Sequence, residues 1–162
     1  MSYFTQLLSQ QTHTLRLPAQ SEDDIQRHVL MHQSSANAEL APFRRQLDCW
    51  AFSIATALAN GLEPLDAPSS SWGRKFADTR SVQMSDGLCN LLAVVAFHHL
   101  GSEHEDIDNP GQIIEVGNRF AGAGCPVVLS YLTTRDLRLT ALSKILDFAQ
   151  SLYESAPIPS NI

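Results

Sequence analysis

The sequence has few cysteines and no long uninterrupted apolar run. Only three cysteines, Cys49, Cys89 and Cys125, occur in 162 residues. They are far apart and each has apolar neighbours, which favours buried thiols in a reducing compartment over a disulfide framework. The longest apolar stretch, 88–100, is too short and too polar to span a bilayer. Residues 1–6 contain no basic segment of the kind that opens a signal peptide. We therefore expect a cytoplasmic protein without membrane contact.

Cations are also scarce. The chain carries 11 Lys and Arg against 17 Asp and Glu, a formal net charge of −6. That balance argues against gripping DNA or RNA over the whole surface, because such binding depends on neutralising phosphates. A local basic patch stays open as an alternative. Its candidates are Arg44, Arg45, Arg74, Lys75 and Arg80.

Several functional signatures are missing from the sequence. It has no internal repeat, no phosphate-binding glycine loop, no nucleophile elbow and no dinucleotide fingerprint. His28 and His32 have helical spacing but no evident third ligand, and zinc normally needs at least three protein ligands. Residues 98–108 are rich in His, Glu and Asp, and either a metal site or a solvated loop fits them. We expect no cofactor and no metal. Whether the loop at 98–108 binds a metal stays open.

What the sequence does contain is helical periodicity. With 44% hydrophobic residues, it predicts an all-α, compact single-domain bundle of about six helices, with the option of one short strand at 14–17. The expected helices are 21–30 capped by Ser21, 42–60, a central 86–100, 110–120 capped by 108 or 109, 126–132 and 137–153. Residues 121–124 should form a tight connection, and 126–132 would also suit a strand. Residues 1–20 are expected to pack on the helical domain, 21–154, and 155–162 to form a frayed tail.

One short motif suggests catalysis. Cys49 is followed by Trp-Ala-Phe-Ser, which is similar to the nucleophile segment of papain-like cysteine proteases. The rest of that pattern is missing, and the adjacent Asp48 would raise rather than lower the thiol pKa. The downstream histidines His98, His99 and His104 lie at a helix end or in an acidic loop rather than on a strand. The better interpretation is that Cys49 is a packed helix residue.

A longer pattern covers about residues 14 to 150. It starts with Leu15-Arg16-Leu17-Pro18, and later includes Trp72 and Phe76 in a loop, the aliphatic helix 88–100, a glycine-rich turn at 120–124 and the apolar run to Leu132. In the middle, at characteristic spacing, are Pro42, Phe43, Asp48, Trp50, Phe52, Ala55 and Gly61. The pattern resembles small helical proteins found beside DNA-phosphorothioation (Dnd) systems and related bacterial anti-phage loci. The loop at 67–80 departs from it, because the usual proline before the tryptophan is absent.

The resemblance implies a non-enzymatic accessory subunit of an anti-phage defence complex. Its partner would be a larger ATPase, nuclease or DNA-modification enzyme from the same locus, with nucleic acid reached only through that partner. Self-association stays open. Trp72, beside Arg74 and Lys75, is the first candidate for a partner contact, since aromatic and arginine residues often anchor interfaces. Folding of Trp72 back onto the core is an equal alternative. A cysteine hydrolase using Cys49 and a nucleic-acid-binding accessory protein are the competing functions.

Overall fold

In the computed structural model, the described residues are 6–8, 12–29, 41–66, 71–79, 84–101, 109–133 and 141–155. Helices dominate them. In chain order the elements are β1 (Thr14–Leu15), η1 (Ala19–Ser21), α2 (Glu22–Arg27), α3 (Gln46–Ala59), β2 (Ala77–Asp78), α4 (Asp86–Leu100), α5 (Pro110–Thr133) and α6 (Ala141–Ser155). Over these ranges the one sheet is the antiparallel pair β1–β2, with Thr14 opposite Asp78. The prediction of an all-α fold with a short N-terminal strand is confirmed.

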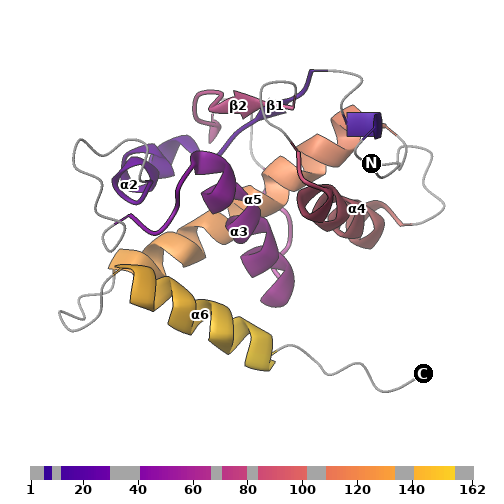
Figure 1. The fold of residues 1–162 in the computed structure, drawn as a ribbon. Coiled ribbons are helices and arrows are strands. Elements are labelled where there is room, and N and C mark those ends of the chain that lie inside the picture. Colours follow the sequence, from indigo (N-terminus) through magenta and orange to yellow (C-terminus); the bar gives the residue numbers. More distant parts are fainter. Residues whose placement is uncertain are drawn as a thin grey trace.

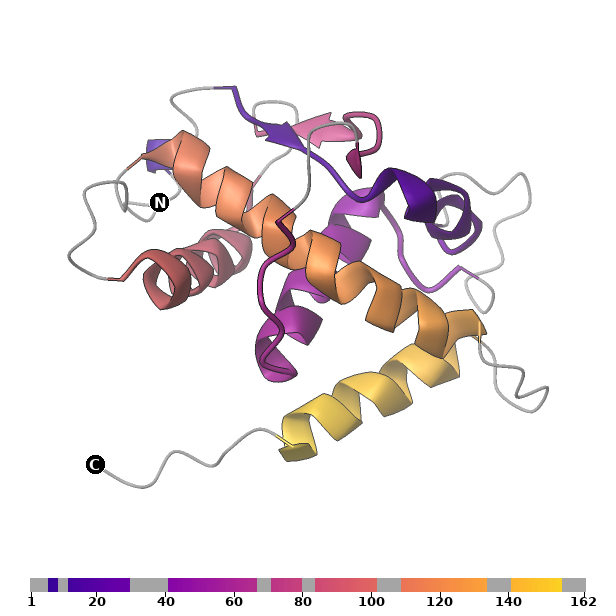
Figure 2. The same ribbon diagram turned by 180° about the vertical axis from the view of Figure 1, so that it is seen from behind.

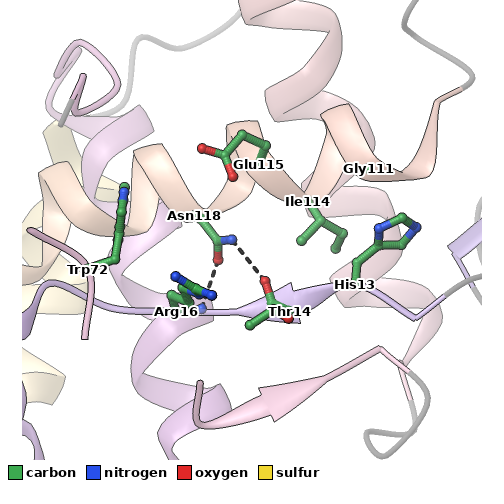
Figure 3. A pocket seen from close by; sticks show the side chains of 8 residues that line it. All are labelled: His13, Thr14, Arg16, Trp72, Gly111, Ile114, Glu115 and Asn118. Atoms are coloured by element: carbon green, nitrogen blue, oxygen red, sulfur yellow. Dashed lines mark hydrogen bonds between the residues drawn. The ribbon is translucent and has the colours of Figure 1, made fainter. Parts of the chain in front are cut away.

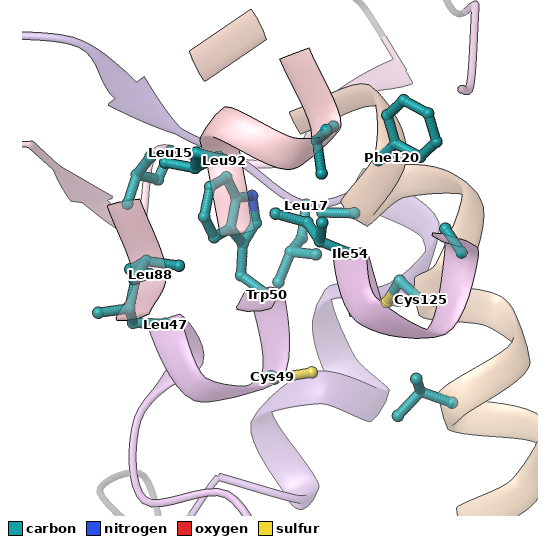
Figure 4. Packing of buried hydrophobic residues seen from close by; sticks show 14 of the residues in the cluster. Leu15, Leu17, Leu47, Cys49, Trp50, Ile54, Leu88, Leu92, Phe120 and Cys125 are labelled. Atoms are coloured by element: carbon teal, nitrogen blue, oxygen red, sulfur yellow. The ribbon is translucent and has the colours of Figure 1, made fainter. Parts of the chain in front are cut away.

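Helix α5 is the axis of the fold (Figures 1 and 2). Helix α3 crosses it and makes the most extensive contact between any two elements described. Helices α4 and α6 both lie on one side of α5 in the two views, while the β1–β2 sheet and α2 lie on the other. The buried side chains of α3, α4 and α5 meet between these layers, around Trp50 (Figure 4).

Helix α3 starts later than the sequence pattern predicts. Pro42 and Phe43 precede it, because Phe43 instead forms a bridge with Val29. The helix begins at Gln46, where the main-chain N–H of Arg45 donates to Asp48 Oδ2 over 2.9 Å. Its predicted end is confirmed: Gly61 has φ +60°, a left-handed conformation that glycine adopts without steric cost.

The predicted tight connection at 121–124 is wrong. Helix α5 runs without a break for 24 residues, and Gly122 and Gly124 are helical. A Cβ on Gly124 would collide with the carbonyl oxygen of Ser53 on α3. The glycine is there because two helices touch, not because the chain turns. The helical choice for 126–132 is confirmed, with Pro126 inside the helix.

Helix α4 has the predicted ends but not the predicted position. Ser85 Oγ accepts from the N–H of Leu88 over 3.2 Å, and Gly101 ends the helix with φ +83°. The all-round apolar sequence predicts a central helix, which is wrong. Val94 is 58% exposed and Phe97 43% exposed, so α4 is a flank of the bundle.

Asn109 caps α5 as expected, its Oδ1 accepting from the N–H of Gly111 over 2.9 Å.

The last two helices are joined by aromatic rings. On α6, Phe148 stacks on Tyr131 with ring centroids 4.6 Å apart and meets Phe52 of α3 edge-on at 6.1 Å. The helix is described from Ala141, so the predicted start at 137 lies outside the described residues.

The lengths and hydropathy of these helices bear on membrane insertion. Among the residues that the structure describes, none forms a helix both long and apolar enough to cross a membrane.

Candidate functional site

Residues 71–79, which we call the strap, lie alongside residues 13–18. The N–H of Gly73 donates to Leu17 O over 2.8 Å, and the N–H of Thr79 donates to His13 O over 3.0 Å. These bonds extend the β1–β2 pairing along most of the strap, with an isolated bridge between Pro18 and Trp72. Two surface cavities open beside this paired segment, and both include side chains from it.

The first cavity, which we call the Arg16 pocket, has a volume of about 310 Å³ and lies between β1, the strap and the N-terminal half of α5 (Figure 3). Apolar surface comes from the half-buried indole of Trp72 and from Ile114. Its lining residues are His13, Thr14, Arg16, Trp72, Gly111, Ile114, Glu115 and Asn118.

Asn118 fixes the position of this pocket. Its Oδ1 accepts from the main-chain N–H of Arg16 over 3.0 Å and from Trp50 Nε1 over 3.1 Å. Its Nδ2 donates to Thr14 O over 3.0 Å. The side chain is only 4% exposed and ties α5 to α3 and to β1. The sequence patterns above do not single out Asn118, although a polar residue on the buried face of a helix, four residues after Ile114, is a signal that could have found it.

His13 stands at the end of the Arg16 pocket opposite Trp72 (Figure 3). Its main-chain N–H donates to Thr79 Oγ1 over 3.0 Å, which joins it to the strap. Burial lowers the pKa of its imidazole, so the ring is neutral at pH 7. Among the described residues, Nε2 has no hydrogen-bond partner. His13 therefore adds a polar ring to the pocket but no positive charge.

The second cavity, which we call the Arg74 groove, has a volume of about 280 Å³. Its apolar surface includes Leu17 and Ile25, which are buried, and Phe76, which is half-buried. Arg74 and Lys75 bring positive charge to it, and Glu22 is its acidic residue. The full lining is Leu17, Pro18, Glu22, Ile25, Gln26, Gln46, Gly73, Arg74, Lys75 and Phe76.

The structure brings the two predicted basic pairs to the same region. Arg44 and Arg45 are exposed and directly precede Gln46, which lines the Arg74 groove, although neither arginine lines it. Arg45 is held by Asp48 at 3.1 Å, and Lys75 by Asp78 at 2.7 Å. Within the described ranges, Arg44 and Arg74 form no ion pair. Arg80 lies outside the described residues.

Trp72 faces the fold rather than standing free. It is half-buried, and a Cβ on Gly122 would approach its Cη2 to 2.9 Å. The indole therefore covers α5 and leaves one part as a wall of the Arg16 pocket. Of the two alternatives for this residue, folding back onto the core describes its position.

The sulfur of Cys49 is sealed inside the bundle (Figure 4). The side chain is 0% exposed. A hydrogen bond with the Cys125 thiol is the larger cause, and burial the second, that raises the pKa of the Cys49 thiol well above its ordinary value. Ser21 does not make the side-chain cap to α2 that the sequence predicts. A thiol in this state is a poor nucleophile.

The histidines of α4 are exposed and lie beside an aromatic ring of α5. His98 and His99 each meet the ring of Phe120 edge-on, at 6.3 Å and 6.0 Å. In the part of the chain that is described, no group of three or more His, Cys, Asp or Glu side chains could hold a metal ion. The acidic residues at 102–108, and His32, lie outside that part.

Comparison with protein-family models, curated proteins and solved structures finds no match for this chain. The function must therefore be inferred from the two cavities and their residues.

Proposed function

We propose that the chain is a non-catalytic interaction subunit that binds an acidic segment of a larger partner protein at the Arg74 groove. The observation that carries this proposal is the composition of the groove. Apolar side chains of Leu17, Ile25 and Phe76 lie beside the cations of Arg74 and Lys75. Apolar contact area combined with charged side chains is typical of protein interfaces.

Charge complementarity favours an acidic partner segment. The chain as a whole carries −6, yet Arg74 forms no ion pair within the described ranges, and exposed Arg44 lies just before groove residue Gln46. An unpaired arginine can form a bidentate bond with a partner carboxylate. Such a contact also steers the encounter, so binding should weaken as salt rises.

The sequence resemblance extends the proposal to a biological setting. On that basis the partner is an ATPase, nuclease or DNA-modifying enzyme of a bacterial anti-phage locus, and the chain is its accessory subunit. Nucleic acid would be reached through the partner. The buried position and raised pKa of Cys49 give no support to the alternative of a cysteine hydrolase.

The test is co-purification of tagged chain with the products of its neighbouring genes. Arg74→Gln should reduce partner recovery at least about fivefold, since a hydrogen bond to a charged group contributes roughly 1.5–3 kcal/mol. Raising the salt concentration should reduce recovery of the unmodified complex as well.

Asn90→Asp is the matched control, because it changes the net charge by the same −1. Asn90 is exposed on α4, and it does not line the groove. Equal losses for the two variants would refute the groove as the contact. Recovery of no partner, under conditions where the locus protects cells, would refute the interaction subunit itself.

A further inference from the structure

The Arg16 pocket contains charges of both signs that do not neutralise each other. Within the described residues, neither Arg16 nor Glu115 forms an ion pair. Figure 3 shows their charged groups on opposite sides of the Asn118 side chain, with Trp72 at one end of the pocket. The cavity is thus a small space with a cation, an anion and an apolar wall.

We propose that this pocket binds a free α-amino acid with an apolar side chain, an activity separate from partner binding at the Arg74 groove. Arg16 receives the ligand carboxylate, Glu115 receives its ammonium group, and the apolar side chain lies against Trp72. Both charged groups of the pocket then gain an ion-pair partner that the described residues do not supply.

Size and charge support this ligand class. A volume of about 310 Å³ lies at the lower end of the range for ligand pockets, roughly 300–1,000 Å³. His13, neutral at pH 7, adds no second cation, so the charged groups of the pocket match one carboxylate and one ammonium.

The position of the pocket is set before any ligand arrives. Asn118 holds the backbone on both sides of Leu15, at Thr14 and at Arg16. Its Oδ1, which accepts from Arg16, also accepts from Trp50 Nε1. The bond to Arg16 uses its main-chain N–H, so replacing the guanidinium leaves it in place. A pre-formed site avoids an ordering cost on binding.

The experiment is calorimetric titration of the isolated chain with L-leucine, with tryptophan fluorescence as a second readout. Binding should shift the fluorescence of Trp72, whereas Trp50 is 0% exposed and bonded to Asn118. The Trp72→Phe variant, which keeps only Trp50, should lose the shift. L-Leucinamide, which lacks the carboxylate, and N-acetyl-L-leucine, which lacks the ammonium group, should bind at least about tenfold more weakly.

Two variants assign the charges. Arg16→Gln and Glu115→Gln should each weaken L-leucine binding at least about tenfold, while Glu63→Gln, at an exposed position outside the pocket, should leave the affinity unchanged. Absence of both heat and a fluorescence shift at millimolar L-leucine would overturn the proposal. So would equal affinity for L-leucinamide or N-acetyl-L-leucine, or equal effects of Glu63→Gln and Glu115→Gln. None of these readouts involves the protein partner, so they do not depend on the proposed function.

Discussion

Replacing Gly124 by alanine tests the crossing of α3 and α5. Alanine is the better helix former by about 1 kcal/mol, so in an open helix the substitution would stabilise the protein. At this position the new methyl group would collide with the carbonyl oxygen of Ser53. It would also lie 2.8 Å from the carbonyl carbon of Ser53 and 3.1 Å from the backbone nitrogen of Ala57. All three atoms are backbone, so no side-chain rotation relieves the contact, and the helices must separate.

The two effects have opposite signs, and the collision should be the larger. Inserting a methyl group into a well-packed core costs about 1–3 kcal/mol, and a clash with backbone belongs at the upper end. After subtraction of the gain in helix propensity, we expect a loss of about 2 kcal/mol in the free energy of unfolding. For a chain of this size that corresponds to a melting temperature lower by roughly 4–8 °C.

Gly87→Ala is the matched control for this measurement. Gly87 lies in the first turn of α4, and a methyl group there would have Ser85 Oγ as its nearest neighbour, 4.0 Å away. The control should be neutral or stabilising by up to about 1 kcal/mol. Urea unfolding followed by circular dichroism gives both values. A Gly124→Ala variant as stable as the original chain would refute the close crossing of the two helices at this residue.

Three further predictions concern buried polar and titratable groups. Asn118→Leu should lower the free energy of unfolding by about 2–4 kcal/mol in urea melts, because it strands the N–H groups of Trp50 and Arg16; a loss below about 1 kcal/mol would contradict this. Burial lowers the pKa of His13 below its ordinary value of 6.5, so protonation of this side chain disfavours the folded state. The stability that the neutral side chain contributes is therefore fully present above pH 6.5 and declines as the pH falls below 6.5. Thermal melts from pH 7.5 to 5 should show this decline. If a His13→Gln variant shows the same decline, the decline does not come from protonation of His13. Iodoacetamide at pH 7.5 should leave Cys49 unlabelled in the native chain and label it in urea, as mass spectrometry of its peptide can show.

Local signals in the sequence predict four of the helix ends, although not the start of α3 or the cap of α2. Ser85 and Asn109 cap through their side chains, and Gly61 and Gly101 end α3 and α4 with positive φ. In each case the determining contact lies within four residues along the chain. Such contacts can be read from sequence alone because no distant partner takes part in them.

Features that depend on distant partners could not be predicted. A glycine pair usually indicates a turn, but Gly124 lies inside α5. The glycine is required there because the backbone of Ser53, far away in sequence, lies against it. Similarly, the apolar residues all around α4 suggest a buried helix, while the structure exposes Val94 and Phe97. Which helix becomes central is decided by which one packs most closely, and composition does not reveal that.

The candidate site was predicted in part. Charge alone identified Arg74 and Lys75, and both line a groove. Sequence reasoning gave no role to Glu115 or to the side chain of Arg16, because their relation arises only when β1 lies against α5. Asn118, which creates that relation through bonds to Thr14 and Arg16, is 102 to 104 residues away from them in the chain.

The central place of α5 has a consequence for synthesis on the ribosome. The contacts of β1, η1, α3 and α4 with α5 require residues that are translated only after position 109. Since translation adds about 5–20 residues per second, the apolar faces of the first hundred residues stay uncovered for several seconds. We therefore expect nascent chains stalled before residue 110 to be sensitive to protease and to engage chaperones, and chains extended past α5 to become resistant in one step.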